Sequence, residues 1–140
     1  MELQLNTLAD IHQVAQQIIA FSDQQKIWVF EGSMGAGKTT LIRAIAKHFN
    51  IVDETSSPTF SLVNVYSDES DNEYYHFDFY RIEKEIEAVD IGCDEYFYSG
   101  QYCFIEWAER IPSLVPPKHI KICIKLGSDN GRIITLSKHD

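Results

Sequence analysis

A glycine-rich segment at residues 32–39 constrains this chain more than any other feature of its sequence. The segment reads GSMGAGKT and fits the pattern GxxxxGK[ST]. An unbroken apolar run precedes it and apolar residues at helical spacing follow it, so it is expected to join a buried parallel strand to a helix. In that setting glycines let successive backbone N–H groups face a phosphate, and the helix N-terminus adds positive potential. The segment therefore predicts a phosphate-binding loop, with Lys38 on the β and γ oxygens and the Thr39 hydroxyl on magnesium.

Helical and strand-like patterns alternate along the rest of the chain. Thr7 and Asp10 resemble a capping box, and the apolar residues after them predict a helix of about four turns. Further helices are predicted from Gly37 to near Asn50 and at residues 82–89. Strands are predicted at residues 27–30, 62–66, 74–79, 102–107, 120–126 and 132–136.

These patterns predict one α/β domain over residues 1–140. The strands at 62–66 and 74–79 would form an antiparallel hairpin, and those at 120–126 and 132–136 another around a turn at Asn130 and Gly131. The apolar strands at 27–30 and 102–107 would be the parallel core. We therefore expect a P-loop NTPase domain with a mixed sheet flanked by helices.

Charge is distributed unevenly along the chain. The 140 residues have a formal net charge of -9, and residues 51–110 hold fifteen acidic side chains against three basic ones, together with all seven tyrosines. An acidic protein is not expected to bind DNA, RNA or anionic lipid by itself, because those partners are bound through Lys and Arg. The acidic, aromatic middle of the chain fits either a surface for a protein partner or a Tyr-rich strand pair with a charged outer face.

The cysteines and the N-terminus favour a cytoplasmic protein. Cys93, Cys103 and Cys123 form no CxxC pair and have no histidine at ligand spacing, which disfavours structural zinc and a disulfide framework. The first ten residues do not resemble a signal peptide, and no apolar run approaches membrane length.

Two carboxylates stand where phosphoryl chemistry needs them, each after an apolar strand. Asp78 follows YHF and Glu106 follows YCFI, and the pattern alone does not rank them as metal ligand or water-positioning group. His76 is expected on the same strand face as Asp78, either as a metal pair or, as we favour, as a hydrogen-bonded couple. Thr59 lies in the loop after the helix that follows the glycine-rich segment, where a nucleotide-sensing threonine could reach magnesium.

Three other interpretations remain open from the residues alone. A guanine-binding signature is weak, because residues 137–140 read SKHD and no DxxG precedes them. A small P-loop kinase has the same core, although the four arginines of the chain are not clustered as in a lid. A nucleotide-dependent binding module that hardly hydrolyses is the third.

Four motifs in order resemble the TsaE family, the ATPase subunits of the bacterial tRNA threonylcarbamoyladenosine system. They are GAGKTT at residues 35–40, SPTF at 57–60, HFDFYR at 76–81 and EWAER at 106–110. The resemblance runs from about residue 7 to residue 126. It implies a magnesium-dependent ATPase that acts on a complex of TsaB and TsaD, which attaches threonylcarbamoyl to adenosine 37 of tRNA. Contact with tRNA would be made through these partners.

The resemblance also implies roles for individual residues. Lys38, Asp78 and Glu106 would be catalytic, with Asp78 on the magnesium side and Glu106 positioning water. Thr59 would be a switch threonine, and Trp107 would lie beside the nucleotide. The implied nucleotide-binding residues are Gly32, Ser33, Met34, Gly35, Ala36, Gly37, Lys38, Thr39, Thr40 and Trp107. The implied magnesium ligands are Thr39, Asp78, Thr59 and Glu106.

Overall fold

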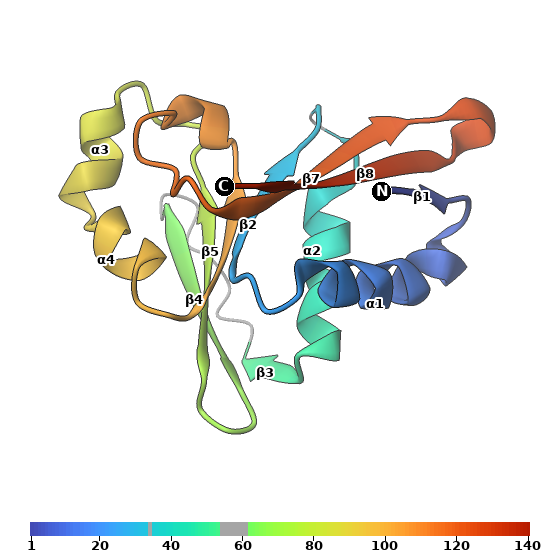
Figure 1. Cartoon of the computed structure of the whole chain (residues 1–140), viewed down its shortest axis with the longest axis horizontal. Coiled ribbons are helices and arrows are strands. Elements are labelled where there is room, and N and C mark those ends of the chain that lie inside the picture. Colours follow the sequence, from blue (N-terminus) through green and yellow to red (C-terminus); the bar gives the residue numbers. More distant parts are fainter. Residues whose placement is uncertain (34, 54–61) are drawn as a thin grey trace.

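The protein is a layered α/β domain with helices on both faces of one mixed sheet (Figure 1). The computed structural model describes residues 1–33, 35–53 and 62–140. Met34 and Thr59, two of the residues expected at the site, lie outside the described residues. The α/β class, the mixed sheet and the flanking helices confirm the expectation from the sequence.

Eight strands form the sheet, in the order β1-β8-β7-β2-β6-β5-β4-β3. Their bounds are β1 Glu2–Leu5, β2 Ile27–Glu31, β3 Ile51–Asp53, β4 Val63–Asp68, β5 Glu73–Asp78, β6 Tyr102–Glu106, β7 His119–Leu126 and β8 Arg132–His139. Strands β7, β2, β6 and β5 are parallel neighbours, and the remaining pairs are antiparallel. The parallel core and both predicted hairpins are therefore confirmed.

The helices are short apart from two. They are α1 Ile11–Ser22, α2 Lys38–His48, α3 Glu85–Asp90 and α4 Cys93–Phe97, with 3-10 turns η1 Leu8–Asp10, η2 Ala108–Arg110 and η3 Ser128–Asn130. The predicted capping box is present, because the Thr7 backbone N–H donates to the Asp10 carboxylate at 3.3 Å. A residue with positive φ follows each long helix, Asp23 at 47° after α1 and Asn50 at 58° after α2. Short polar side chains tolerate that conformation, which ends a helix.

The two faces of the sheet pack against different helices. On one face Trp28, Phe30 and Phe104 pack with the apolar sides of α1 and α2. On the other face Phe77 and Ile105 pack with α3, α4 and the η2 region. Strand β2, inside the parallel core, is an apolar run buried on both faces, whereas β7, at the border of the parallel core, alternates buried isoleucines with less buried residues.

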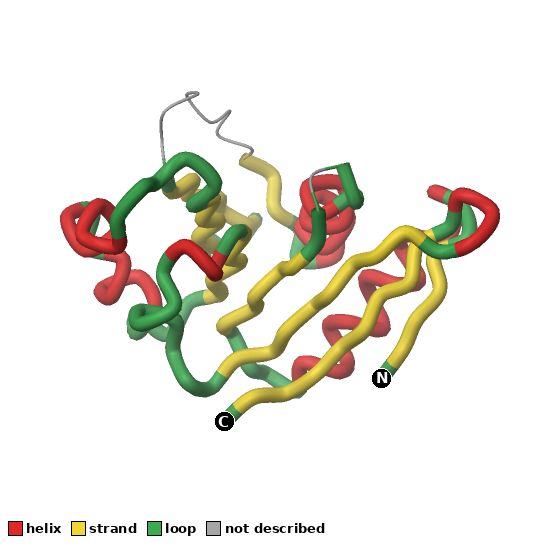
Figure 2. The backbone as a smooth tube through the Cα atoms, turned by 90° about the horizontal axis from the view of Figure 1, so that it is seen from above, coloured by secondary structure: helices red, strands yellow, loops and turns green. Residues whose placement is uncertain are grey.

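Two strands and one α-helix were not predicted from the sequence. Strands β1 and β3 are only four and three residues long and lie at the two edges of the sheet, where pairing with β8 and β4 defines them. Helix α4 begins directly after Gly92, whose φ of 78° turns the chain from α3 into α4. Figure 2 shows the long β7–β8 ribbon with the N-terminal strand beside β8. Within the described residues, every helix is too short or too polar to cross a membrane.

Candidate functional site

The parallel core brings three segments to the same edge of the sheet. Strand β6 lies between β2 and β5, and its last residue, Glu106, is the register partner of both Phe30 and Asp78. All three strands run in the same direction, so their carboxyl ends meet. The glycine-rich loop, defined as residues 32–37, starts just beyond β2 at this edge. A crevice beyond the carboxyl ends of parallel strands is the usual ligand site of an open α/β sheet.

The glycine-rich loop depends on glycines at specific positions. Gly35 and Gly37 have φ of 83° and 103°, which disfavours residues with a side chain. Gly32 has ordinary φ but packs closely on β7, where a Cβ atom would approach the Ile124 carbonyl oxygen to 2.9 Å. Arg132 of β8 also donates from Nε to the Ala36 carbonyl at 3.0 Å. The loop is therefore anchored to the C-terminal hairpin on one side and continues into α2 on the other.

A cleft of about 360 Å³ opens at this edge beside the glycine-rich loop. It is lined by Gly35, Gly37, Lys38, Thr39, Thr40, Asp78, Tyr80, Glu106 and Trp107. The three residues expected to be catalytic thus line one cleft, although they come from α2, β5 and β6. Three other expected nucleotide contacts, Gly32, Ser33 and Ala36, belong to the loop but do not line this cleft.

Lys38 and Trp107 are in direct contact in the cleft. The Lys38 Nζ atom lies 4.1 Å from the centre of the Trp107 ring, a cation–π geometry. The Lys38 side chain is buried. The Tyr80 ring packs against Trp107, with 5.0 Å between the two ring centres. Trp107 has a φ of 59°, unusual for a bulky residue, and such conformations cluster at functional sites.

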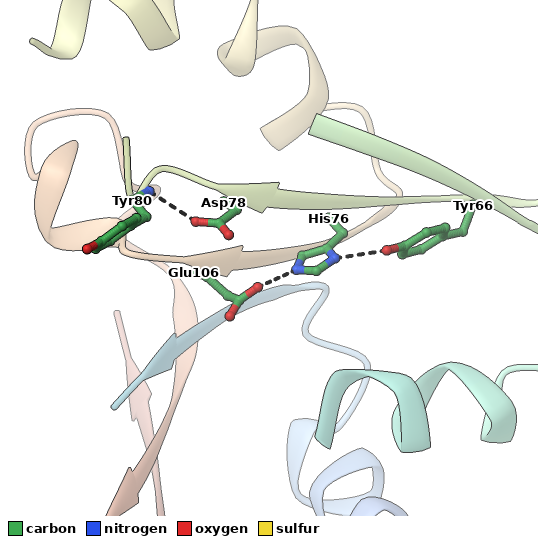
Figure 3. Close-up of polar contacts among 5 residues, drawn as sticks. All are labelled: Tyr66, His76, Asp78, Tyr80 and Glu106. Atoms are coloured by element: carbon green, nitrogen blue, oxygen red, sulfur yellow. Dashed lines mark hydrogen bonds and ion pairs between the residues drawn. The ribbon is translucent and has the colours of Figure 1, made fainter. Parts of the chain in front are cut away.

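His76 bridges Glu106 and Tyr66 (Figure 3). The His76 Nε2 atom is 2.6 Å from Glu106 Oε2, and its Nδ1 atom is 3.0 Å from the Tyr66 hydroxyl. Asp78 points elsewhere and accepts from the Tyr80 backbone N–H at 3.0 Å. The predicted hydrogen bond between His76 and Asp78 is therefore wrong. Both ring nitrogens of His76 have other partners, and the carboxylate that His76 contacts belongs to Glu106, its diagonal neighbour on β6.

Oxygen atoms dominate the polar groups of the cleft. Thr39 offers a hydroxyl, and Asp78 and Glu106 offer carboxylates, of which Asp78 is exposed and Glu106 is buried. Among the described residues, no three His, Cys, Asp or Glu side chains lie close enough together to hold a metal ion. The cleft can thus contribute a few oxygen ligands to a cation but not a complete protein cage.

A second cavity, of about 300 Å³, lies on the other side of the glycine-rich loop. It shares Gly35, Gly37 and Thr40 with the cleft and is otherwise lined by Leu5, Asn6, Thr7, Leu8, Ile11, Ala36, Leu41, Ile124, Asn130, Arg132 and Ile134. This cavity was missed from the sequence. Its walls come from the N-terminal segment, the loop and the C-terminal hairpin, and no local pattern links these three.

The residues considered for guanine binding lie away from the loop. Ser137 pairs with Lys121 and His139 with His119, at the start of β7. Trp28, near the start of β2, is the register partner of Ile120, whereas the loop follows the end of β2. Residues 137–140 therefore lie at the opposite edge of the sheet from the cleft.

Comparison with known proteins gives a consistent result. A family model described as "Threonylcarbamoyl adenosine biosynthesis protein TsaE" matches residues 5–134. A protein of Bacillus subtilis named tRNA threonylcarbamoyladenosine biosynthesis protein TsaE is 37% identical over 124 residues, covering 89% of this chain and 77% of that protein. One of the same name from Treponema pallidum is 34% identical over 115 residues, covering 82% and 84%. The crystal structure of YdiB from Bacillus subtilis superposes with a TM-score of 0.78 at 27% identity, covering 100% of this chain and 86% of that chain.

Proposed function

The chain belongs to the TsaE family of threonylcarbamoyladenosine biosynthesis proteins, and from this premise we propose that it binds and hydrolyses ATP with magnesium. Hydrolysis would support turnover of the TsaB–TsaD complex that modifies adenosine 37 of tRNA. The observation that carries the proposal is the meeting of the glycine-rich loop, Lys38 and two strand-end carboxylates at one cleft. Such an arrangement combines phosphate binding with groups for a metal and a water molecule.

In this proposal the triphosphate would lie in the cleft between the loop and the two carboxylates. The N-terminus of α2 starts at Lys38 and directs its free backbone N–H groups and positive potential toward this space. Lys38 already lies within the cleft, where it would approach the β and γ oxygens. Phosphates would then compete with the Trp107 ring for the Lys38 charge.

The second cavity is suited to the base and the sugar. It adjoins the cleft through the loop, so a nucleotide could pass over Gly35 and Gly37 with its phosphates on one side and its base on the other. Its lining combines apolar side chains such as Leu8 and Ile134 with the polar groups of Asn6 and Asn130. A mostly apolar cavity with a few polar groups is typical of a site for a flat ring.

The oxygen donors of the cleft fit magnesium. Mg²⁺ prefers oxygen ligands, keeps several waters and is usually bound by one or two protein groups together with substrate phosphates. Thr39 and Asp78 would supply the protein ligands beside the phosphates, and Thr59 remains a proposed further ligand. When bound, the ion would neutralise charge on the β and γ phosphates.

Glu106 is the better of the two carboxylates for positioning the attacking water. It is 4% exposed and held by His76, whereas Asp78 is exposed at the strand end beside Tyr80. A fixed carboxylate accepts hydrogen bonds from water in one orientation, which lowers the entropic barrier to an in-line attack. We therefore assign Asp78 to the metal side and Glu106 to the water side.

The charge of the chain supports a role through protein partners. With a net charge of -9, direct attraction to tRNA is unfavourable, so TsaB and TsaD would hold the RNA. The acidic excess at residues 51–110 surrounds Asp78 and Glu106 in the sequence, so a partner surface near the cleft could respond to the nucleotide. We place this function in the cytoplasm.

The experiment that tests the proposal compares ATP hydrolysis by the chain alone, with TsaB–TsaD, and with TsaB–TsaD and tRNA. We expect slow release of phosphate alone, a faster rate with the partners and a strong loss in Glu106→Gln under all conditions. Equal rates with and without the partners would contradict the proposed coupling between ATP hydrolysis and the TsaB–TsaD complex. γ-Labelled ATP offered with small hydroxyl compounds separates this function from a kinase, which would transfer the label to an acceptor instead of to water.

A further inference from the structure

Tyr66, His76 and Glu106 form a hydrogen-bonded chain that runs across three strands into the cleft (Figure 3). We propose that His76 and Tyr66 are positioning residues: His76 fixes the rotamer of Glu106 toward the attacking water, and Tyr66 fixes the orientation of the His76 ring. The inference rests on the proposed ATP hydrolysis.

The sheet register explains why this chain of bonds forms. Tyr66 is opposite Tyr74 on β5, two residues before His76, and Glu106 is opposite Asp78, two residues after it. The three side chains therefore lie on one face of the sheet and step diagonally from β4 to β5 to β6. Diagonal neighbours on adjacent strands are within reach of aromatic and long side chains. The register sets the connection, and neither His76 nor Glu106 could make it from a strand shifted by one residue.

Burial makes the contact between His76 and Glu106 specific. The two residues are 7% and 4% exposed, so water cannot readily replace either partner. The short bond of 2.6 Å from the His76 Nε2 atom therefore holds the Glu106 carboxylate in one orientation toward the cleft.

The donors and acceptors can be assigned along the hydrogen bonds that join Tyr66, His76 and Glu106. A carboxylate only accepts hydrogen bonds, so the His76 Nε2 atom carries the hydrogen of its bond to Glu106. In a neutral imidazole Nδ1 is then an acceptor, and the Tyr66 hydroxyl donates to it across 3.0 Å. The order is thus Tyr66 O–H to Nδ1, and Nε2–H to Glu106 Oε2. The alternative tautomer would present a lone pair to the carboxylate, so Glu106 selects the tautomer, and the Tyr66 hydroxyl holds the other side of the ring in place.

This arrangement gives the two carboxylate oxygens of Glu106 different partners. Oε2 is occupied by His76, which leaves Oε1 of Glu106 for the cleft that this residue lines. His76 itself does not line the cleft, so it acts through Glu106 and not on the nucleotide. Loss of such an orienting partner typically costs an active site about ten- to a hundredfold in activity.

The test uses single-turnover hydrolysis and nucleotide binding, measured separately for each variant. We expect His76→Leu to lower the rate about ten- to a hundredfold, while the dissociation constant for magnesium–ATP stays within about threefold, because the phosphate and base contacts are untouched. Tyr66→Phe should lower the rate by less, without weakening binding. Tyr75→Phe is the matched control, since its hydroxyl bonds to Glu73 on the other face of the same strand pair, and it should leave the rate unchanged.

Combined variants separate positioning from general structural support. If the Tyr66 hydroxyl acts on Glu106 through His76, the double variant Tyr66→Phe with His76→Leu should be no slower than His76→Leu alone. For the same reason His76→Leu should add nothing to Glu106→Gln. Additive losses in either pair would overturn the proposal, as would a His76→Leu protein as fast as, or faster than, the unchanged chain.

A second pair of variants covers the case in which His76→Leu fails to fold. The side-chain amide of Gln can place an N–H donor where His76 Nε2 lies, whereas that of Asn is too short to reach Oε2. We expect His76→Gln to recover most of the activity and His76→Asn to remain slow. Equal rates for these two polar variants would overturn the proposal. If the unchanged chain releases no phosphate under any condition, the proposed hydrolysis fails and the positioning role fails with it. If the unchanged chain releases phosphate and His76→Leu does so equally fast, only the positioning role fails.

Discussion

At the scale of single residues, the most informative contact in the cleft is the one between Lys38 and Trp107. The Lys38 Nζ atom lies 4.1 Å from the centre of the indole, and both side chains line the same cleft as Asp78 and Glu106. A cation over an aromatic ring contributes about 0.5 to 2 kcal/mol, depending on burial. A triphosphate offers several charged oxygens and should therefore draw Lys38 away from the ring, which makes this contact sensitive to nucleotide.

Lys38→Ala should weaken nucleotide binding without unfolding the protein. A hydrogen bond to a charged group contributes about 1.5 to 3 kcal/mol, so the dissociation constant for magnesium–ATP should rise at least about tenfold. Isothermal titration calorimetry measures it directly. Lys47→Ala, at an exposed position on the same helix, is the matched control and should bind as the unchanged chain does. An unchanged affinity in Lys38→Ala would show that the phosphates lie elsewhere.

Intrinsic fluorescence should report nucleotide binding through Trp107. The chain has two tryptophans, and Trp28 is fully buried within the α1 and α2 side of the core, away from the cleft. Movement of Lys38 from the Trp107 ring to phosphate changes the environment of that indole alone. We expect magnesium–ATP to change the emission of the unchanged chain but not that of Trp107→Phe. A response that survives in Trp107→Phe would have to come from the core and would contradict this assignment.

At the scale of elements, the glycine-rich loop is held by β7 and β8 as well as by its own helix. Gly32 lies against the Ile124 carbonyl of β7, and Arg132 of β8 donates to the Ala36 carbonyl. The C-terminal hairpin thus supports the loop through its contacts with Gly32 and Ala36. The positive φ values of Gly35 and Gly37 bend the backbone within that support.

Gly32→Ala should destabilise the protein by forcing the loop away from β7. The added Cβ atom would lie 2.9 Å from the Ile124 carbonyl oxygen, which belongs to the backbone of a central strand and cannot rotate aside. Overpacking of this kind costs about 1 to 3 kcal/mol of unfolding free energy, measured from urea denaturation. Arg43→Ala, exposed on α2, should change it by less than about 0.5 kcal/mol. An equal midpoint for the two variants would contradict the predicted clash.

At the scale of the whole molecule, the sheet separates two hydrophobic cores. One lies between the sheet and α1 with α2, and the other lies between the parallel strands and α3 with α4. The second core contains Cys93 and Cys103, both completely buried, whereas Cys123 on β7 is half-buried. All three are free thiols. Burial raises the pKa of the Cys93 thiol to about 11 and that of Cys103 to about 12.

Alkylation should therefore distinguish the three cysteines in the folded protein. The thiolate is the reactive form, and raising its pKa removes it at ordinary pH. At pH 8 iodoacetamide should modify Cys123 alone, so mass spectrometry should find one adduct per chain, and three after denaturation in urea. Rapid modification of Cys93 or Cys103 in the folded protein would show that the second core opens far more readily than its packing indicates.

The sequence alone went far in predicting local structure. Gly35, Gly37 and the apolar run before them fixed the strand, loop and helix at residues 27–48, because glycine sterics and side-chain periodicity act over a few residues. Both hairpins were predicted for the same reason. Strands β1 and β3 were not, because each is short and is stabilised only by a partner distant in the chain.

What the sequence by itself determined was the α/β class, the glycine-rich loop and the two candidate carboxylates. Only the tertiary structure decided which groups they meet: Glu106 bonds to His76, 30 residues earlier, and the loop is held by Arg132, 96 residues after Ala36. Periodicity and turn chemistry are written in neighbouring residues, whereas strand order and register follow from the packing of the whole sheet. Register placed Glu106 diagonally from His76, and the fold left Glu106 buried while its direct partner Asp78 is exposed.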